Sequence, residues 1–248
     1  MIKQKLCTGG NKIFEGQLRG YTFSLMQNLK LLRLNKTGIS QIDDDAFFNL
    51  AKLKHLDLSK NFLSTVPGRA FTNLISLETL DLSKNYISRI APFDFNDLIS
   101  LKTIVLSDQN NQLVLVDREA FGVMSLLETV QLDKNSRLAY VDPESFLFCP
   151  LLKNLDLRET AVEMVGENLM ISLRALNSLK IDELRCDCQM MWIHNSTFAR
   201  GLNICNFVIN FNRCFRKMAT LACQLARMVY RQKLERFIIN GKFILLIL

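Results

Sequence analysis

The chain has 248 residues, of which 49% are hydrophobic and 22% are charged, and its formal net charge is +7. This length and hydrophobic content suffice for a long buried core, which excludes an intrinsically disordered segment. The basic excess is local, because residues 200–248 hold nine of the 31 Lys and Arg but one of the 24 Asp and Glu. Residues 1–199 are therefore nearly neutral and give no indication of nucleic-acid binding.

Residues 1–26 contain a partial copy of the repeat that fills the middle of the chain, marked by Phe23 and Met26. The opening stretch "MIKQKLCTGGNKIFEG" has no apolar segment of the kind that a secretory signal peptide requires. It holds a single cysteine, Cys7. We expect the apolar end of the first full unit, at Leu29, to lie open, because terminal caps normally cover such ends.

Residues 27–183 repeat the pattern L-x-x-L-x-L-x-x-N-x-L about seven times. The copies begin at Leu29, Leu53, Leu77, Leu101, Leu127, Leu152 and Leu176. A column of phenylalanines keeps the same period, at Phe23, Phe47, Phe71, Phe95, Phe121 and Phe146. Successive copies start 24 to 26 residues apart. A repeat of this length indicates a solenoid of stacked units, each of which buries its apolar face against its neighbours.

Within each unit the x-L-x-L segment alternates, which predicts a short strand with the leucines facing a common core. The Phe column is expected to stack on the opposite, convex side. The predicted fold class is an α/β-type solenoid, with a parallel β-sheet on the concave face and irregular or short helical turns on the convex face.

An asparagine follows the strand in three units, as Asn61, Asn85 and Asn135. A buried turn leaves backbone N–H and C=O groups without partners, and a side-chain amide can satisfy both kinds. Thr37 and Thr160 take this place in the first and sixth units. We expect these two turns to be slightly weaker, because a hydroxyl does only part of this work.

The motifs "LDLSKN", "VPGRAF" and F-x-x-L-x-x-L make residues 13–197 resemble animal extracellular leucine-rich repeat proteins of the typical 24-residue kind. The stretch "LRCDCQMMWI" (184–193) resembles the start of their cysteine-rich C-terminal cap, where C-D-C precedes a Trp. The Asn-Pro usual before the first cysteine is replaced by "DELR". The resemblance therefore implies a leucine-rich repeat horseshoe ending in a degenerate cap at residues 184–211. Family members often carry a cysteine-rich N-terminal cap as well, so the resemblance implies that this cap is missing or truncated here, where residues 1–26 hold one cysteine.

Family caps hold four cysteines in two bridges, the first with the third and the second with the fourth, so the resemblance implies disulfide bonds. Cys186 and Cys188 match the first two; their partners come from Cys205, Cys214 and Cys223, which leaves the pairing open. A zinc site of Cys186, Cys188, His194 and a later cysteine is the alternative, but C-x-C without a second close pair is poor zinc spacing, so no metal is expected. Cys149, in an apolar column, is expected to be a buried free thiol.

Residues 212–248 form a basic amphipathic helix followed by an apolar tail. Phe215, Met218, Ala222, Leu225 and Val229 recur at helical spacing, with basic and polar residues on the other side. We favour a helix that covers the end of the last repeat; contact with a membrane surface or a partner is the other interpretation. The final "FILLIL" is too short to span a bilayer.

Two N-glycosylation sequons, at Asn35 and Asn195, suit a secreted protein. The repeat subtype and the C-D-C cap also favour the cell surface or the extracellular space. Because no signal peptide is encoded, we interpret the chain as a fragment or an incomplete gene model of such a protein. If Met1 is the true start, the chain is instead a cytosolic scaffold with reduced thiols.

His55, Asp57 and Ser59 are the three residue types of a hydrolase triad, but they alternate along one strand. Residues two apart on a strand lie about 7 Å apart, without the direct nucleophile–base contact of a triad. The sequence also lacks a Gly-rich phosphate loop and a G-x-S-x-G motif. We therefore expect no enzyme, no catalytic residue and no cofactor.

The outward positions of the strands form columns across the concave face, and they are the predicted protein-binding residues. They are Arg33, His55, Asp57, Ser59, Thr79, Asp81, Ser83, Thr103, Val105, Gln131, Asp133, Asn154, Asp156 and Arg158. This surface is polar and mildly acidic and has no aromatic row, which predicts polar or basic contacts, or else binding on another face. A glycan at Asn35 would block access to the N-terminal end of this concave face.

Three functions fit these features. The first is a recognition module of a cell-surface or secreted protein, in adhesion or as a receptor ectodomain. The second is a fragment of a Toll-type innate-immune receptor ectodomain, and the third is a cytosolic scaffold. A protein ligand is expected in each, and nucleic acid in none.

Overall fold

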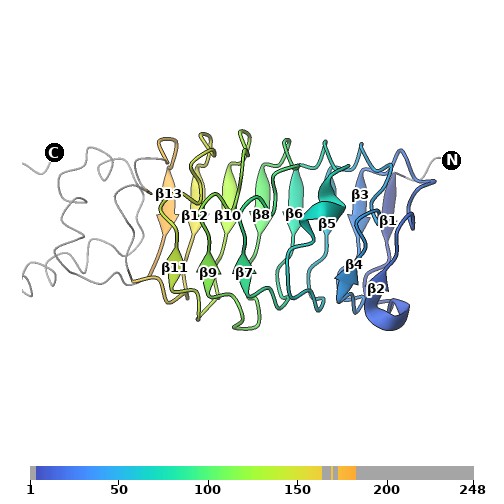
Figure 1. The fold of residues 1–248 in the computed structure, drawn as a ribbon, viewed down its shortest axis with the longest axis horizontal. Helices are drawn as coiled ribbons and strands as arrows, with labels where there is room; N and C mark the ends of the chain where they lie inside the picture. The colour runs from blue at the N-terminus through green and yellow to red at the C-terminus, as the bar shows by residue number, and fades with distance from the viewer. Residues whose placement is uncertain (1–3, 164–168, 170–172, 183–248) are drawn as a thin grey trace, which may run out of the picture.

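The computed structural model describes residues 4–163, 169 and 173–182 as a solenoid of short strands lying side by side (Figure 1). The main sheet has eight parallel strands in the order β1-β3-β5-β6-β8-β10-β12-β13. Their bounds are Lys5–Cys7, Leu31–Arg33, His55–Asp57, Thr79–Asp81, Thr103–Val105, Thr129–Gln131, Asn154–Asp156 and Ser178–Lys180. The predicted leucine-rich repeat solenoid is confirmed, and the seven units of residues 27–183 contribute seven of these strands.

A second layer runs along the other side of the solenoid (Figure 1). It consists of a three-stranded sheet of β7 (Arg89–Ile90), β9 (Leu115–Val116) and β11 (Tyr140–Val141), and a pair formed by β2 (Gln17–Leu18) and β4 (Gln41–Ile42). Two 3-10 helices, η1 (Phe14–Gly16) and η2 (Gly68–Phe71), also belong to the described part. The segments between these elements are turns and irregular structure, which agrees with the irregular convex side predicted from the sequence.

Equivalent positions of successive units pair across the main sheet. Leu32 lies opposite Leu56, and Leu56 lies opposite Leu80. These inward leucines are at most 1% exposed. Burying such a side chain contributes about 1.5–3 kcal/mol, and a unit gains it only when neighbours stack on both sides.

The phenylalanine column stacks as predicted and fills the core between the two layers. Four neighbouring pairs stack, with ring centroids 4.6–6.3 Å apart: Phe23–Phe47, Phe47–Phe71, Phe95–Phe121 and Phe121–Phe146. From Phe47 onward each ring is at most 1% exposed. Because each ring packs between neighbours, the column fixes the spacing of the units.

Buried amides link each turn to the unit before it. Asn61 Nδ2 donates to the carbonyls of Leu34 and Leu58, both at 2.9 Å, and its Oδ1 accepts from the N–H groups of Thr37 and Ile39. Asn85 and Asn135 donate in the same way to a carbonyl of their own unit and one of the preceding unit. The amide role predicted from the sequence is therefore confirmed.

The fourth unit uses a residue that the sequence analysis did not single out. Gln109 Nε2 donates to Leu82 at 2.9 Å and to Leu106 at 3.2 Å, and its Oε1 accepts from the Ile87 N–H. The longer side chain thus makes the asparagine contacts inside a turn that carries two extra residues. Its position in the repeat could have identified it, because Gln109 lies three residues after Leu106, as Asn61 does after Leu58.

The expectation of an open apolar end at Leu29 was wrong. Strand β1 pairs in parallel with β3, with Leu6 opposite Leu32, and Leu29 is fully buried. Leu6 and Ile13 pack against the core from this first, incomplete unit. The pattern search missed this unit because Lys3 stands where the other copies have the first leucine.

Candidate partner-binding face

The outward side chains of the main sheet form one face. Ten of the fourteen predicted binding residues belong to its strands, and the other four come two residues after a strand: Ser59, Ser83, Asp133 and Arg158. In β5 the central leucine is buried while His55 is exposed and Asp57 partly exposed, and other strands alternate in the same way. The most exposed of the set are Arg33, His55, Asn154 and Arg158. Ser59 and Asp156, at 7% and 8%, are nearly buried and contribute little to an accessible surface.

Residues at equivalent positions of neighbouring strands lie opposite one another and form rows across the sheet, as predicted. His55 lies opposite Thr79, and Thr79 lies opposite Thr103. The same pairings place Asp57 opposite Asp81. Neighbouring strands lie about 4.8 Å apart, so side chains in one row reach the same ligand group.

The two central aspartates partly satisfy the turns that follow their strands. Asp57 Oδ1 accepts from the Ser59 N–H at 3.0 Å and from Ser59 Oγ at 2.7 Å. Asp81 Oδ1 accepts from the Ser83 N–H at 2.9 Å. Neither carboxylate has an ion-pair partner among the described residues, so both keep acceptor capacity for a ligand.

The geometry of His55, Asp57 and Ser59 is not that of a catalytic triad. The Asp57–Ser59 hydrogen bond is local turn chemistry. His55 bonds to neither residue within the described part of the chain. No general base therefore contacts the Ser59 hydroxyl as nucleophilic catalysis requires.

The C-terminal part of the face is electrostatically satisfied. Arg158 binds both carboxylate oxygens of Asp156, at 3.0 and 2.7 Å, and Lys180 Nζ lies 3.5 Å away. Burial acts to raise the pKa of Asp156, but the Arg158 hydrogen bonds outweigh it and hold the pKa below its ordinary value. Of the four aspartates in the predicted set, Asp57, Asp81 and Asp133 thus have no ion-pair partner among the described residues, and Asp57 and Asp81 lie on paired strands.

A row of charged side chains borders the face at the start of the strands, and the sequence analysis missed it. Glu78 accepts from Lys54 at 2.6 Å and from Lys102 at 3.1 Å, so one carboxylate bridges three consecutive units. Hydrogen bonds from Lys54 and then Lys102 lower the pKa of Glu78 to about 2. The sequence does contain a signal for this row, because a Lys or Glu directly precedes each of these strands.

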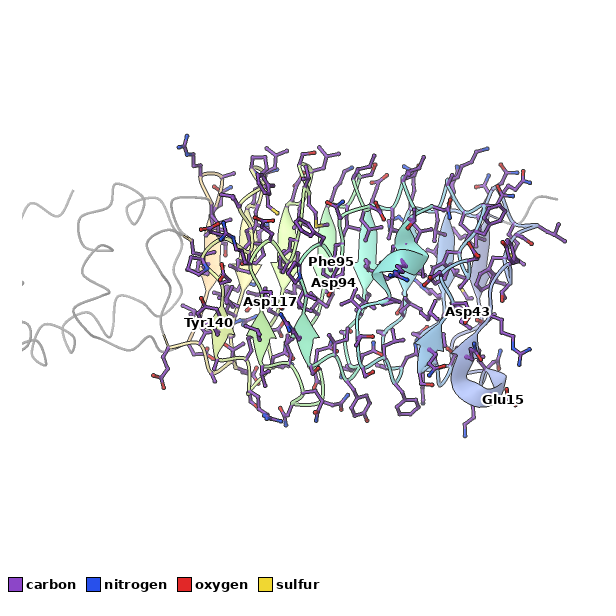
Figure 2. All side chains as sticks on the ribbon, viewed as in Figure 1. Glu15, Asp43, Asp94, Phe95, Asp117 and Tyr140 are labelled. Atoms are coloured by element: carbon purple, nitrogen blue, oxygen red, sulfur yellow. The ribbon has the colours of Figure 1, made fainter. Side chains whose placement is uncertain are left out.

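A separate group of ionisable side chains lies beside the three-stranded sheet (Figure 2). Arg89 pairs with Asp117, and the Asp94 carboxylate accepts from the Ala91 N–H at 2.8 Å. Burial raises the pKa of Asp94 to about 6. The Ala91–Asp94 hydrogen bond closes the turn that leads into Phe95, on the side away from the concave face.

The predicted glycosylation and cysteine sites differ in how much the structure describes of them. Asn35 follows β3, is partly exposed, and accepts from the Gly10 N–H at 3.0 Å through its carbonyl. Cys149 is a buried free thiol, as predicted, and burial raises its pKa to about 12. Outside the described residues lie residues 184–248, with Asn195, His194, Cys186, Cys188, Cys205, Cys214 and Cys223.

Neither a metal site nor a membrane helix was found in the part of the chain that the structure describes. Its His, Cys, Asp and Glu side chains form no group of three that could hold a metal ion. The helical segments among residues 4–163, 169 and 173–182 are too short or too polar to cross a bilayer.

Two sequence-family profiles match the chain. "Leucine rich repeat" matches residues 17–61, 27–87, 58–113 and 75–136, and "BspA type Leucine rich repeat region" matches residues 116–239. No curated protein sequence matches the chain. Among solved structures, the crystal structure of a TLR13–ssRNA13 complex is similar, with a TM-score of 0.56 and 21% identity over 81% of this chain and 36% of that one. At this identity the likeness shows the fold alone, and this chain spans little more than a third of the matched one.

Proposed function

Because this chain belongs to the leucine-rich repeat family, we propose that it is a non-enzymatic module that recognises a protein ligand on its concave face. The in-register columns of the eight-stranded sheet carry this proposal. They present short polar side chains on a backbone held by a continuous core. Such a surface favours binding, because preorganised groups lose little entropy when a partner docks.

The charge pattern narrows the chemistry of the ligand. Asp57 and Asp81 lie on paired strands without a cationic partner in the described structure, whereas Asp156 is neutralised by Arg158 and Lys180. We expect a basic side chain of the ligand to dock at β5 and β6. Two neighbouring carboxylates do not suit a phosphate backbone, which supports a protein ligand over a nucleic acid.

For the full-length protein we propose a cell-surface or secreted recognition molecule, in adhesion or as a receptor ectodomain. The two sequons and the resemblance of the repeats and of the C-D-C segment support this location. The likeness to TLR13 supports the more specific alternative of a Toll-type receptor ectodomain. A cytosolic scaffold is the third reading and requires that every cysteine is a free thiol.

Intact mass tests the location. The chain is produced in an animal secretory cell line behind a borrowed signal peptide and weighed before and after reduction and glycosidase treatment. We expect disulfide-linked cysteines and a glycan at Asn35 or Asn195. Seven free thiols with no glycan would favour the cytosolic scaffold.

A binding screen tests the concave face. The full chain is presented to a panel of purified secreted and cell-surface proteins, and each ligand found is remeasured with Asp57→Lys/Asp81→Lys. We expect at least about a tenfold loss of affinity, because the lysines repel a basic anchor. Val123→Lys, at a 55% exposed position outside the main sheet, is the matched control and should bind normally. Equal affinity of the ligand for the unsubstituted chain, the double variant and the control variant would contradict the proposal.

A further inference from the structure

Two exposed aromatic side chains lie side by side on the flank of the solenoid, in the turns after β5 and β6. Phe62 is 56% exposed and Tyr86 is 38% exposed, and each directly follows the buried asparagine of its unit. Their rings stack, with centroids 5.8 Å apart and planes 26° apart. The pair thus forms an apolar ledge outside the concave columns, where the core does not use it.

A lysine lies in each of three successive turns, those after β3, β5 and β6. Lys36, Lys60 and Lys84 are each the third residue after a main-sheet strand, and all three have a positive φ of 56–57°. Each donates its backbone N–H to the next unit, at 2.9–3.0 Å. This shared conformation places the three side chains at successive steps of the repeat, in a row beside the ledge.

The row is not neutralised at its N-terminal end. Lys84 pairs with Asp108 at 3.7 Å. Lys36 and Lys60 are exposed and have no ion-pair partner within the residues that the structure describes. Two lysines with unoccupied ammonium groups therefore border Phe62.

The unit before that of Phe62 has no side chain at the equivalent position. Gly38 takes that position, and a Cβ built on it would meet no atom within 4 Å. The two turns are adjacent, since the Phe62 N–H donates to the Ile39 carbonyl at 2.7 Å. The surface at Gly38 is therefore left open next to the turn that carries Lys60 and Phe62.

The fold does not require these residues. At the position of Phe62 and Tyr86 the later units have Asn110, Ser136 and Ala161, and at the lysine position they have Asp108, Lys134 and Glu159. The same turn thus forms with small or polar residues and with either charge. The combination of aromatic rings with unpaired lysines is confined to the first three units.

We propose that Lys36, Lys60, Phe62 and Tyr86 form a second docking surface, on the flank, for an acidic protein segment that carries an apolar side chain. The apolar side chain packs on Phe62 over the open surface at Gly38, and carboxylates of the segment pair with Lys36 and Lys60. Aromatic and cationic groups arranged in this way are typical anchors of protein interfaces. The concave face carries Asp57 and Asp81 and repels such a segment, so the two surfaces select ligands of opposite charge.

An acidic protein segment suits the surface better than single-stranded nucleic acid does. Nucleic-acid platforms offer open ring faces on which successive bases stack, along a continuous basic groove. Here the two rings already stack on each other, and Asp108 interrupts the lysine row after Lys84. The surface therefore offers one apolar ledge and two cations, which match a short acidic motif.

The test uses fluorescence anisotropy with the full chain. The probe is a labelled peptide of Asp and Glu with one central Phe; a peptide with Ser in place of that Phe and an oligothymidine are comparisons. We expect the Phe peptide to bind tightest, with affinity that falls as salt is added. Lys36→Glu/Lys60→Glu and Phe62→Ser/Tyr86→Ser should each weaken it at least about tenfold.

The matched control is Lys134→Glu, the same turn position in a unit without the aromatic pair. It adds the same kind of charge change, and we expect less than about a twofold loss. The substituted side chains are exposed, so unchanged thermal unfolding confirms that each variant is folded. Absence of peptide binding, or equal losses for Lys134→Glu and Lys36→Glu/Lys60→Glu, would overturn the proposal. Tighter binding of oligothymidine that depends on Phe62 and Tyr86 would replace it with a nucleic-acid surface. The concave-face screen uses other residues and a basic ligand, so either proposal can fail alone.

Discussion

The turns of the second to fifth units differ from the turn of the sixth in how they reach their neighbours. Asn61, Asn85, Gln109 and Asn135 are at most 2% exposed, and each donates to a carbonyl of the preceding unit. Thr160 is only partly buried, and its hydroxyl donates to Leu157 of its own unit at 2.7 Å. A hydroxyl has one proton to donate, whereas a carboxamide has two.

The difference shows what couples one repeat to the next. Where an amide is present, strand pairing, core contacts and a buried hydrogen bond all cross the boundary between units. At Thr160 strand pairing and core contacts remain, but the buried bridge is absent from the contacts that the structure describes. In a solenoid, whose stability is a sum of units and interfaces, this boundary is expected to open first.

Removing one complete amide bridge should have the largest effect. Asn61→Ala removes three donated and three accepted hydrogen bonds and leaves buried backbone groups of two units without partners. We expect the free energy of unfolding to fall by about 3–5 kcal/mol, as measured by urea titration. A loss below about 1 kcal/mol would mean that water replaces the amide, and that the bridge couples the units weakly.

Converting an amide turn into a hydroxyl turn isolates the bond between units. In Asn135→Thr the hydroxyl can still bond to Leu132, but the bond to Leu106 and the one accepted from the Gln109 N–H are lost. We expect a loss of about 1–3 kcal/mol in the same titration. Asn135→Ala is the control: if it costs no more than Asn135→Thr, the local hydroxyl bond has no value.

The reverse substitution should give a smaller gain. Thr160→Asn supplies a second donor that can reach the Leu132 carbonyl, the counterpart of Leu106 in the Asn135 turn. We expect the free energy of unfolding to rise by about 0.5–1 kcal/mol, because Thr160 is partly solvated and part of the gain is lost to water. Hydrogen exchange should show slower opening at Leu157 and Ala161. Unchanged exchange at these two residues would show that the missing amide is not what weakens this boundary between units.

An exposed bridge between units should contribute least and should depend on pH. The pKa of Glu78 is lowered to about 2 by Lys54 and Lys102, so its stabilising effect is complete above the unfolded pKa of about 4.3 and is lost as pH falls toward 2. Glu78→Gln should therefore slightly destabilise the chain at pH 7 and match the wild type near pH 2. Thermal unfolding at both pH values measures the difference, and an equal difference at both would exclude the ion pairs as its cause.

The sequence predicts the repeated part of this fold well, because each unit depends on a pattern that its neighbours share. Alternation at residues 55–59 sets which side chains face the core, and the period sets which strands pair. Strand β1 escaped the pattern because Lys3 stands where the other copies have the first leucine. The pairs of β7, β9 and β11 were also missed, since strands of two residues depend on neighbouring turns more than on their own sequence.

The candidate site divides in the same way. The columns follow from strand geometry, so their members were predictable. Neutralisation of Asp156 by Arg158 and Lys180, and the bridging of two lysines by Glu78, depend on side-chain conformations that no spacing encodes. The Phe62–Tyr86 ledge belongs to neither the core pattern nor the concave columns, and its significance depends on the open space at Gly38 that the structure reveals.

Hydrogen exchange of the full chain, with and without a ligand captured in the binding screen, tests the concave-face proposal most directly. The proposal predicts that the ligand slows exchange in β5 and β6 and in the residues that follow them, 55–59 and 79–83. It also predicts unchanged exchange in β7, β9 and β11, on the opposite layer. Protection confined to that layer, with none in β5 or β6, would contradict recognition by the concave face.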